Sequence, residues 1–108
     1  MNNYKLSDFT KGWVIGDFFP TISKNSNFEL AVKNYSEGEF EPKHYQKIAT
    51  EITIVIEGEI LLGGEKFTAG DIIEIPPMEA AEFSSITSST LVCLKYPSIP
   101  NDKVLSDG

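Results

Sequence analysis

The sequence predicts an all-β domain, and three features of its 108 residues lead to that class. Apolar residues recur at every second position in short runs, the pattern of a strand with one face in a core. Gly, Pro, Asn and Ser separate these runs at short spacing, as in sandwiches and barrels. Almost no segment shows the 3.6-residue period of an amphipathic helix. The length fits a single domain with one core.

The first half of the chain contains four expected strands. Residues 12–19 end at a proline, and residues 28–35 alternate between apolar and polar or small side chains. A third strand is expected within 42–47. A fourth covers 51–56 and places three isoleucines on one face: Ile52, Ile54 and Ile56.

The second half continues in the same way. Residues 60–62 and 66–67 flank Gly63-Gly64, a pair that tolerates the positive φ of a tight hairpin. The strand at 72–75 ends at two prolines, which cannot donate to a ladder. Two more strands are expected, at 81–87 and 90–96. The core barrel is therefore expected at about 12–96, with a packed or frayed tail at 97–108.

Charge and composition exclude some classes of partner. The formal net charge is −7 and the nine Lys and Arg are scattered singly, so phosphate backbones and anionic membranes would be repelled. No run approaches the roughly 18 apolar residues of a membrane span. The lone Cys93 cannot form an internal disulfide, and the first residues lack a signal-peptide pattern, so we expect a cytoplasmic protein.

The middle of the chain resembles the cupin family. The first cupin motif reads G, five residues, H-x-H, four residues, E, six residues, G. Its spacing is matched here by Gly38, His44, Gln46, Glu51 and Gly58, with Gln46 where the family has its second histidine. The resemblance implies a cupin-type double-stranded β-helix, which is a jelly-roll barrel of about six to eight strands around one pocket.

The second cupin motif is only half retained. Gly70 and Pro76 match, whereas Met78, Ala81 and Ser85 stand at the positions of the family's glycine, histidine and asparagine. Because Met78 replaces a turn glycine, we expect the bend there to have a different backbone angle.

In cupins, the histidines and the glutamate of these motifs bind one metal ion inside the barrel. The resemblance carries this role to His44, Gln46 and Glu51, while Ala81 contributes no ligand. One imidazole and one carboxylate make a poor zinc site and an incomplete two-histidine iron site. We therefore expect a metal that is absent or weakly bound, with Mn, Fe, Ni or Zn all compatible. The alternative is a hydrogen-bonded polar cluster without metal.

The expected pocket leaves three functions open. The first is binding of a small polar metabolite, of the sugar or carboxylate type, with Phe40, Ala81, Phe83 and Tyr96 lining the pocket. The second is a metal-dependent isomerase, lyase or oxygenase in which His44 and Glu51 are catalytic. The third is a metal-free epimerase that pairs His44 with an acid and a tyrosine. Exposed strand edges also favour a homodimer.

Overall fold

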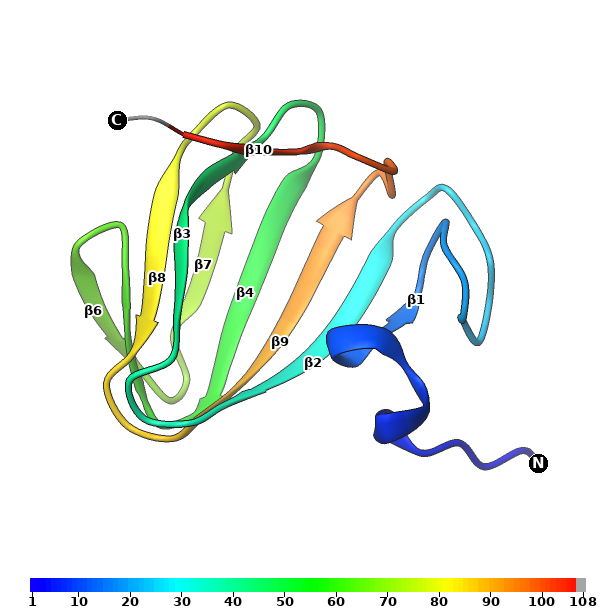
Figure 1. Cartoon of the computed structure of the whole chain (residues 1–108), viewed down its shortest axis with the longest axis horizontal. Helices are drawn as coiled ribbons and strands as arrows, with labels where there is room; N and C mark the ends of the chain where they lie inside the picture. The colour runs from blue at the N-terminus through cyan, green and yellow to red at the C-terminus, as the bar shows by residue number, and fades with distance from the viewer. Residues whose placement is uncertain (107–108) are drawn as a thin grey trace.

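Two five-stranded antiparallel sheets face each other in the computed structural model, which describes residues 1–106 (Figure 1). The first sheet has the strand order β1-β2-β9-β4-β7, and the second has the order β10-β3-β8-β5-β6. The predicted all-β class is confirmed. The described part of the chain has ten strands, more than the six to eight expected, because short strands at the edges extend both sheets.

The strands of the first sheet are β1 (Trp13–Ile15), β2 (Glu29–Tyr35), β9 (Ser89–Tyr96), β4 (Thr50–Glu57) and β7 (Ile72–Ile75). Before β1 the chain forms two single-turn 3-10 helices, η1 (Leu6–Asp8) and η2 (Thr10–Gly12). Within residues 1–106, no helix has the length and apolar character needed to cross a membrane.

The strands of the second sheet are β10 (Lys103–Leu105), β3 (Phe40–Gln46), β8 (Ala81–Ser85), β5 (Glu59–Leu62) and β6 (Glu65–Thr68). Part of the expected tail thus belongs to the barrel, since β10 pairs antiparallel with β3 and crosses the upper end of the view in Figure 1. The last two residues of that tail lie outside the described residues.

Two turns test the backbone predictions. Gly63 and Gly64 have φ values of 60° and 82° and join β5 to β6, as the hairpin prediction required. At Met78, φ is 71°, in the left-handed region that a glycine would occupy at low cost, and the Met78 N–H donates to the Gln46 carbonyl at 2.7 Å. Methionine therefore adopts here a backbone conformation that costs a glycine less.

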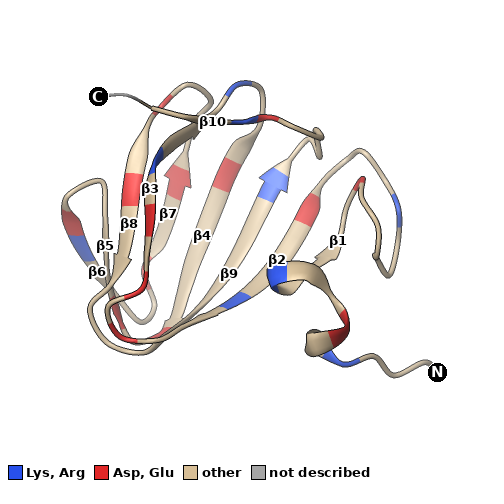
Figure 2. Cartoon of the chain, in the orientation of Figure 1, with Lys and Arg blue, Asp and Glu red and all other residues tan. Residues whose placement is uncertain are grey.

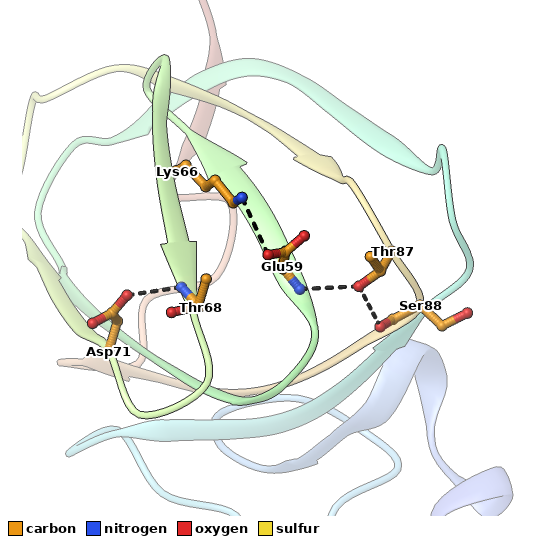
Figure 3. A network of polar contacts seen from close by, with 6 residues as sticks. All are labelled: Glu59, Lys66, Thr68, Asp71, Thr87 and Ser88. Atoms are coloured by element: carbon orange, nitrogen blue, oxygen red, sulfur yellow. Dashed lines mark hydrogen bonds and ion pairs between the residues drawn. The ribbon is translucent and has the colours of Figure 1, made fainter.

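The core lies toward one end of the barrel. Its buried members come from both sheets: Ala31, Val55, Ile60, Phe83, Leu91 and Cys93. At this end, the turns that link the strands are held by polar contacts (Figure 3). Lys66 forms an ion pair with Glu59 at 3.1 Å, and the Glu59 N–H donates to the Thr87 hydroxyl at 3.0 Å. Asp71 accepts from the Thr68 N–H at 2.7 Å.

Alternation in β4 places its isoleucines on the outer face of the first sheet. Thr53 and Val55 are 3% and 1% exposed and face inward, so Ile52, Ile54 and Ile56 face outward. Ile56 is 54% exposed. In this sheet the outer face is more aliphatic than the inner one, which leaves polar side chains for the interior.

Asp102 holds the segment before β10 against the turn between β3 and β4. Its side chain is 4% exposed and accepts from the backbone N–H groups of Ile48, at 3.0 Å, and Ala49, at 2.9 Å. The Lys47 N–H donates to the Asp102 carbonyl at 3.1 Å. One residue therefore satisfies three backbone donors at the end of the barrel opposite the core.

Substitution Asp102→Ala should lower the free energy of unfolding by about 2–3 kcal/mol, because it leaves the buried N–H of Ala49 and the partly buried N–H of Ile48 without their charged acceptor. Urea unfolding followed by circular dichroism measures this loss. Glu37→Ala, which removes an exposed carboxylate from a turn, serves as the control and should change stability by less than about 0.5 kcal/mol. Equal effects of the two changes would contradict the anchoring role.

Candidate functional site

A cavity of about 240 Å³ opens between the two sheets, beyond the core. His44 and Gln46 enter its wall from β3, Glu51 from β4, and Ala81 and Phe83 from β8. Five residues that the sequence pointed to thus share one cavity.

Phe40 and Tyr96, also expected in the pocket, lie elsewhere and are 71% and 39% exposed. Phe40 precedes Glu41 and Tyr96 follows Lys95, and the side chains of Glu41 and Lys95 face inward. Because neighbouring residues of a strand point to opposite faces, the aromatic rings face outward. Tyr45, between His44 and Gln46, also borders the cavity.

His44 and Gln46 lie on β3, and Glu51 lies on β4. These two strands are consecutive in the chain but belong to different sheets, so the side chains line the cavity from opposite sheets. The His44 ring donates from Nδ1 to the Pro42 carbonyl at 2.9 Å, since a carbonyl oxygen only accepts. In the neutral ring, Nε2 then carries the lone pair.

The donor set does not fit a resident metal ion. Among residues 1–106, no three His, Cys, Asp or Glu side chains come together in a group that could hold one. The amide at position 46 adds no charge and is a weak ligand compared with the imidazole that it replaces. We therefore derive no chemistry through a metal.

The first sheet contributes a row of charges that the sequence analysis missed. Its register pairs Glu29 with Lys95 and Lys95 with Glu51, so an acid, a base and an acid lie side by side on β2, β9 and β4. Figure 2 shows these bands at similar heights on the three strands. The alternation of side chains along each strand would predict these three charges inside the barrel if the polar face of the strand, and not the apolar face, were assigned to the interior.

The next row toward the core consists of small side chains. Ala31, Cys93 and Thr53 are paired across the sheet and are each less than 8% exposed. Their size leaves room for the cavity above the core. Burial raises the pKa of the Cys93 thiol to about 12, with the charge of Glu51 adding to the effect. The thiol is therefore neutral at physiological pH and is not an activated nucleophile.

Two lysines flank an indole at the edge of the cavity. The ammonium of Lys95 lies 4.8 Å from the centre of the Trp13 ring, and that of Lys33 lies 5.3 Å from it. Both distances fall in the range of cation–π attraction. In the described part of the chain, neither ammonium has a carboxylate within 4.0 Å. Burial lowers the pKa of Lys33, and the charge of Glu41 opposes this shift.

Four of the nine Lys and Arg residues line this one cavity: Lys11, Lys33, Lys95 and Lys103. Three glutamates accompany them: Glu41, Glu51 and Glu79. In a chain with a net charge of −7, the cavity is therefore a local exception where positive charge balances or exceeds negative charge.

Tyr35 and Glu41 form a fixed polar pair on the cavity wall. The Tyr35 hydroxyl donates to Glu41 Oε2 at 2.5 Å, and Lys103 lies 3.6 Å from Oε1. The Tyr35 ring also packs on Phe83, with centroids 4.5 Å apart. Burial and the bond to Glu41 raise the pKa of Tyr35. Burial alone would raise the pKa of Glu41, but Tyr35 and Lys103 outweigh it and the pKa is lowered.

A lowered carboxyl pKa predicts loss of stability in acid. The contribution of Glu41 is fully present above its ordinary pKa of 4.5 and is lost as the pH falls through the lower value of the folded state. Glu41→Gln should cost about 1–2 kcal/mol at pH 7 and should flatten the decline in melting temperature between pH 6 and pH 3. Glu82→Gln, an exposed change on the same sheet, is the control. An unchanged acid decline in Glu41→Gln would contradict this assignment.

Comparison with known proteins identifies the fold. No protein-family model matches the sequence, and no curated protein does. Among solved structures, a double-stranded β-helix protein from Klebsiella pneumoniae has a TM-score of 0.70 at 18% identity, covering 78% of this chain and 74% of that chain. An RmlC-like cupin from Shewanella frigidimarina has a TM-score of 0.65 at 21% identity, covering 71% and 72%.

A sugar phosphate isomerase of the cupin superfamily from Silicibacter pomeroyi has a TM-score of 0.68 at 20% identity, covering 77% of this chain and 59% of that chain. Two facing antiparallel sheets with this topology, shared with such structures, give the chain the cupin fold, a small double-stranded β-helix.

Proposed function

We propose that the cavity binds a small anionic metabolite, of the carboxylate or sugar-acid type, without a metal ion. The observation that carries this proposal is the pair Lys33 and Lys95, which flank Trp13 at the cavity edge without a carboxylate partner in residues 1–106. A partly desolvated ammonium gains most from an anion that enters its site. The indole face adds an apolar contact for the rest of the ligand.

The other candidate is a metal-dependent enzyme that uses His44 and Glu51. The presence of both side chains in one cavity favours it, as does the tautomer of His44, with Nε2 free to bind. Against it stand the neutral amide at position 46 and the missing fourth ligand at Ala81. The Tyr35–Glu41 pair does not supply acid–base chemistry either, because the pKa shifts move both groups away from neutrality.

Calorimetric titration with gluconate and with sorbitol tests the proposal, since the two share a carbon chain and differ in the carboxylate. The wild-type protein should bind gluconate and not sorbitol. Lys33→Met should weaken gluconate binding by roughly 10- to 100-fold, the value of a hydrogen bond to a charged group. It should leave the melting temperature unchanged or raise it, because it removes a poorly compensated charge. Lys66→Met, at the far hairpin, should change neither.

Two results would contradict the proposal: equal binding of gluconate and sorbitol, or a loss of gluconate binding in Lys66→Met as large as that in Lys33→Met. Elemental analysis of the same untagged preparations separates the enzyme candidate. Stoichiometric metal in the wild type that disappears in His44→Ala would favour the metal-dependent enzyme over the metal-free binding protein.

We also propose a homodimer that forms through the outer face of the first sheet. Paired strands present seven aliphatic side chains on that face: Leu30, Val32, Ile52, Ile54, Ile72, Val92 and Leu94. Ile72 is 68% exposed. A two-fold contact matches a surface to itself, so two chains with a charge of −7 meet most favourably where like charges are few. The outward positions of β2 and β9 are all uncharged, and Glu74 lies on the edge strand β7, which supports a second copy whose contact centres on β2, β9 and β4.

Ile72→Lys and Ile54→Lys should each convert the dimer, at twice the 12.0 kDa of the chain, to a monomer. Size exclusion with light scattering measures this, and far-ultraviolet circular dichroism confirms that the variants fold. Leu61→Lys, on the second sheet, is the matched control and should stay dimeric. A monomeric wild type, or dimers that survive both isoleucine changes, would contradict this interface. The cytoplasmic location and the single domain stay predictions.

A further inference from the structure

A second cavity, of about 250 Å³, adjoins the first. Three side chains belong to the walls of both: Gln46, Lys95 and Lys103. Each cavity is smaller than the roughly 300 Å³ at which small-molecule pockets begin, whereas the two together exceed that size. The three shared side chains lie between the two cavities, and a ligand that used both would contact them.

Gln46 carries an unfulfilled hydrogen-bonding group in that shared wall. The residue is 6% exposed, and its Nε2 has no acceptor among the described residues. Buried amide groups in folded proteins nearly always have a partner, and an orphaned N–H is unfavourable. The donor is buried in the wall, so the oxygen of a ligand would reach it when the side chain turns toward one of the two cavities.

The charges of the second cavity differ from those of the first. Three acids line it, Asp17, Glu29 and Asp102, and burial raises the pKa of Glu29, with Lys95 and Ser98 opposing the shift. The Ser98 hydroxyl donates to Glu29 Oε1 at 3.3 Å. Carboxylates of this kind accept hydrogen bonds from hydroxyl groups and repel a second anion. The compartment suits the neutral, hydroxylated part of a ligand.

We propose that Gln46 joins the two cavities into one site for a polyhydroxy acid, whose carboxylate lies by Lys33 and Lys95 and whose hydroxyl groups enter the second cavity. A ligand hydroxyl oxygen accepts from Gln46 Nε2, and ligand O–H groups donate to the carboxylates of Glu29 and Asp17. This inference rests on the proposed function and adds the chemistry of the ligand's uncharged end.

Three probes of equal chain length separate the parts of the proposal in calorimetric titrations. Gluconate has one carboxylate and a hydroxylated chain, hexanoate has the carboxylate alone, and glucarate has a second carboxylate. The wild type should bind gluconate most tightly, and hexanoate roughly 10-fold more weakly because it leaves the polar groups of the second cavity unpaired. Glucarate should bind more weakly than gluconate, since its second charge meets the three acids.

The substitution Gln46→Leu separates this site from the proposed function. It should weaken gluconate binding by roughly fivefold, about the value of one neutral hydrogen bond, and should leave hexanoate binding unchanged. Lys33→Met should weaken both. The melting temperature of the unliganded Gln46→Leu protein should stay equal or rise, because a buried donor without a partner is removed.

The outcomes are distinguishable. If neither gluconate nor hexanoate binds, the proposed function fails. If both bind with equal affinity, and Gln46→Leu changes neither, anion binding stands and the joined site is wrong, with ordered water as the partner of Gln46. A melting temperature that falls by several degrees in Gln46→Leu would show an internal partner for the amide and would also overturn the inference.

Discussion

The register of β9 between β2 and β4 determines what the barrel can contain. With this register, the side chains of Lys95, Glu51 and Lys33 face inward, and the aliphatic side chains at the alternate positions of the same strands face outward. Because side chains alternate, a shift of one residue would exchange the two sets, filling the interior with valine, leucine and isoleucine. The sheet would gain a larger core and lose its cavity. The small side chains in the row below, such as Ala31, leave the space that the register opens.

This arrangement concentrates stability and function in different parts of the barrel. Aliphatic side chains and turn contacts hold one end, where Val55 and Leu91 are nearly inaccessible to solvent. The other end holds two lysines beside the face of Trp13, and burial lowers the pKa of one of them, Lys33. Binding sites commonly retain such unfavourable charges because they favour the ligand, at the expense of the stability of the empty protein. Glu41, paired with Tyr35 and Lys103, is also the acid whose charge most favours the protonated form of Lys33.

The sequence predicted most strands well and their orientation poorly, for a physical reason. The exception is the first strand, expected at residues 12–19, which covers only Trp13–Ile15. Period-two alternation identifies a strand regardless of which face is buried, so the strand at 72–75 was predicted at its observed limits. The usual assumption that apolar residues face inward fails where the interior is a polar cavity. That failure hid Lys33 and Lys95, and it also placed the aromatic ring of Phe40 inside. Motif spacing located His44 and Glu51 in one cavity but could not show that they come from opposite sheets, which depends on long-range pairing.

Trp13 is the only tryptophan of the chain, and it lies in the wall of the cavity beside two ammonium groups. The emission of an indole depends on the charges and the water around it, so all tryptophan fluorescence of the protein originates in one wall of the cavity. An anion that draws the lysines away from the ring would alter the colour and yield of that light. The protein thus carries its own optical reporter of occupancy, without dye or label.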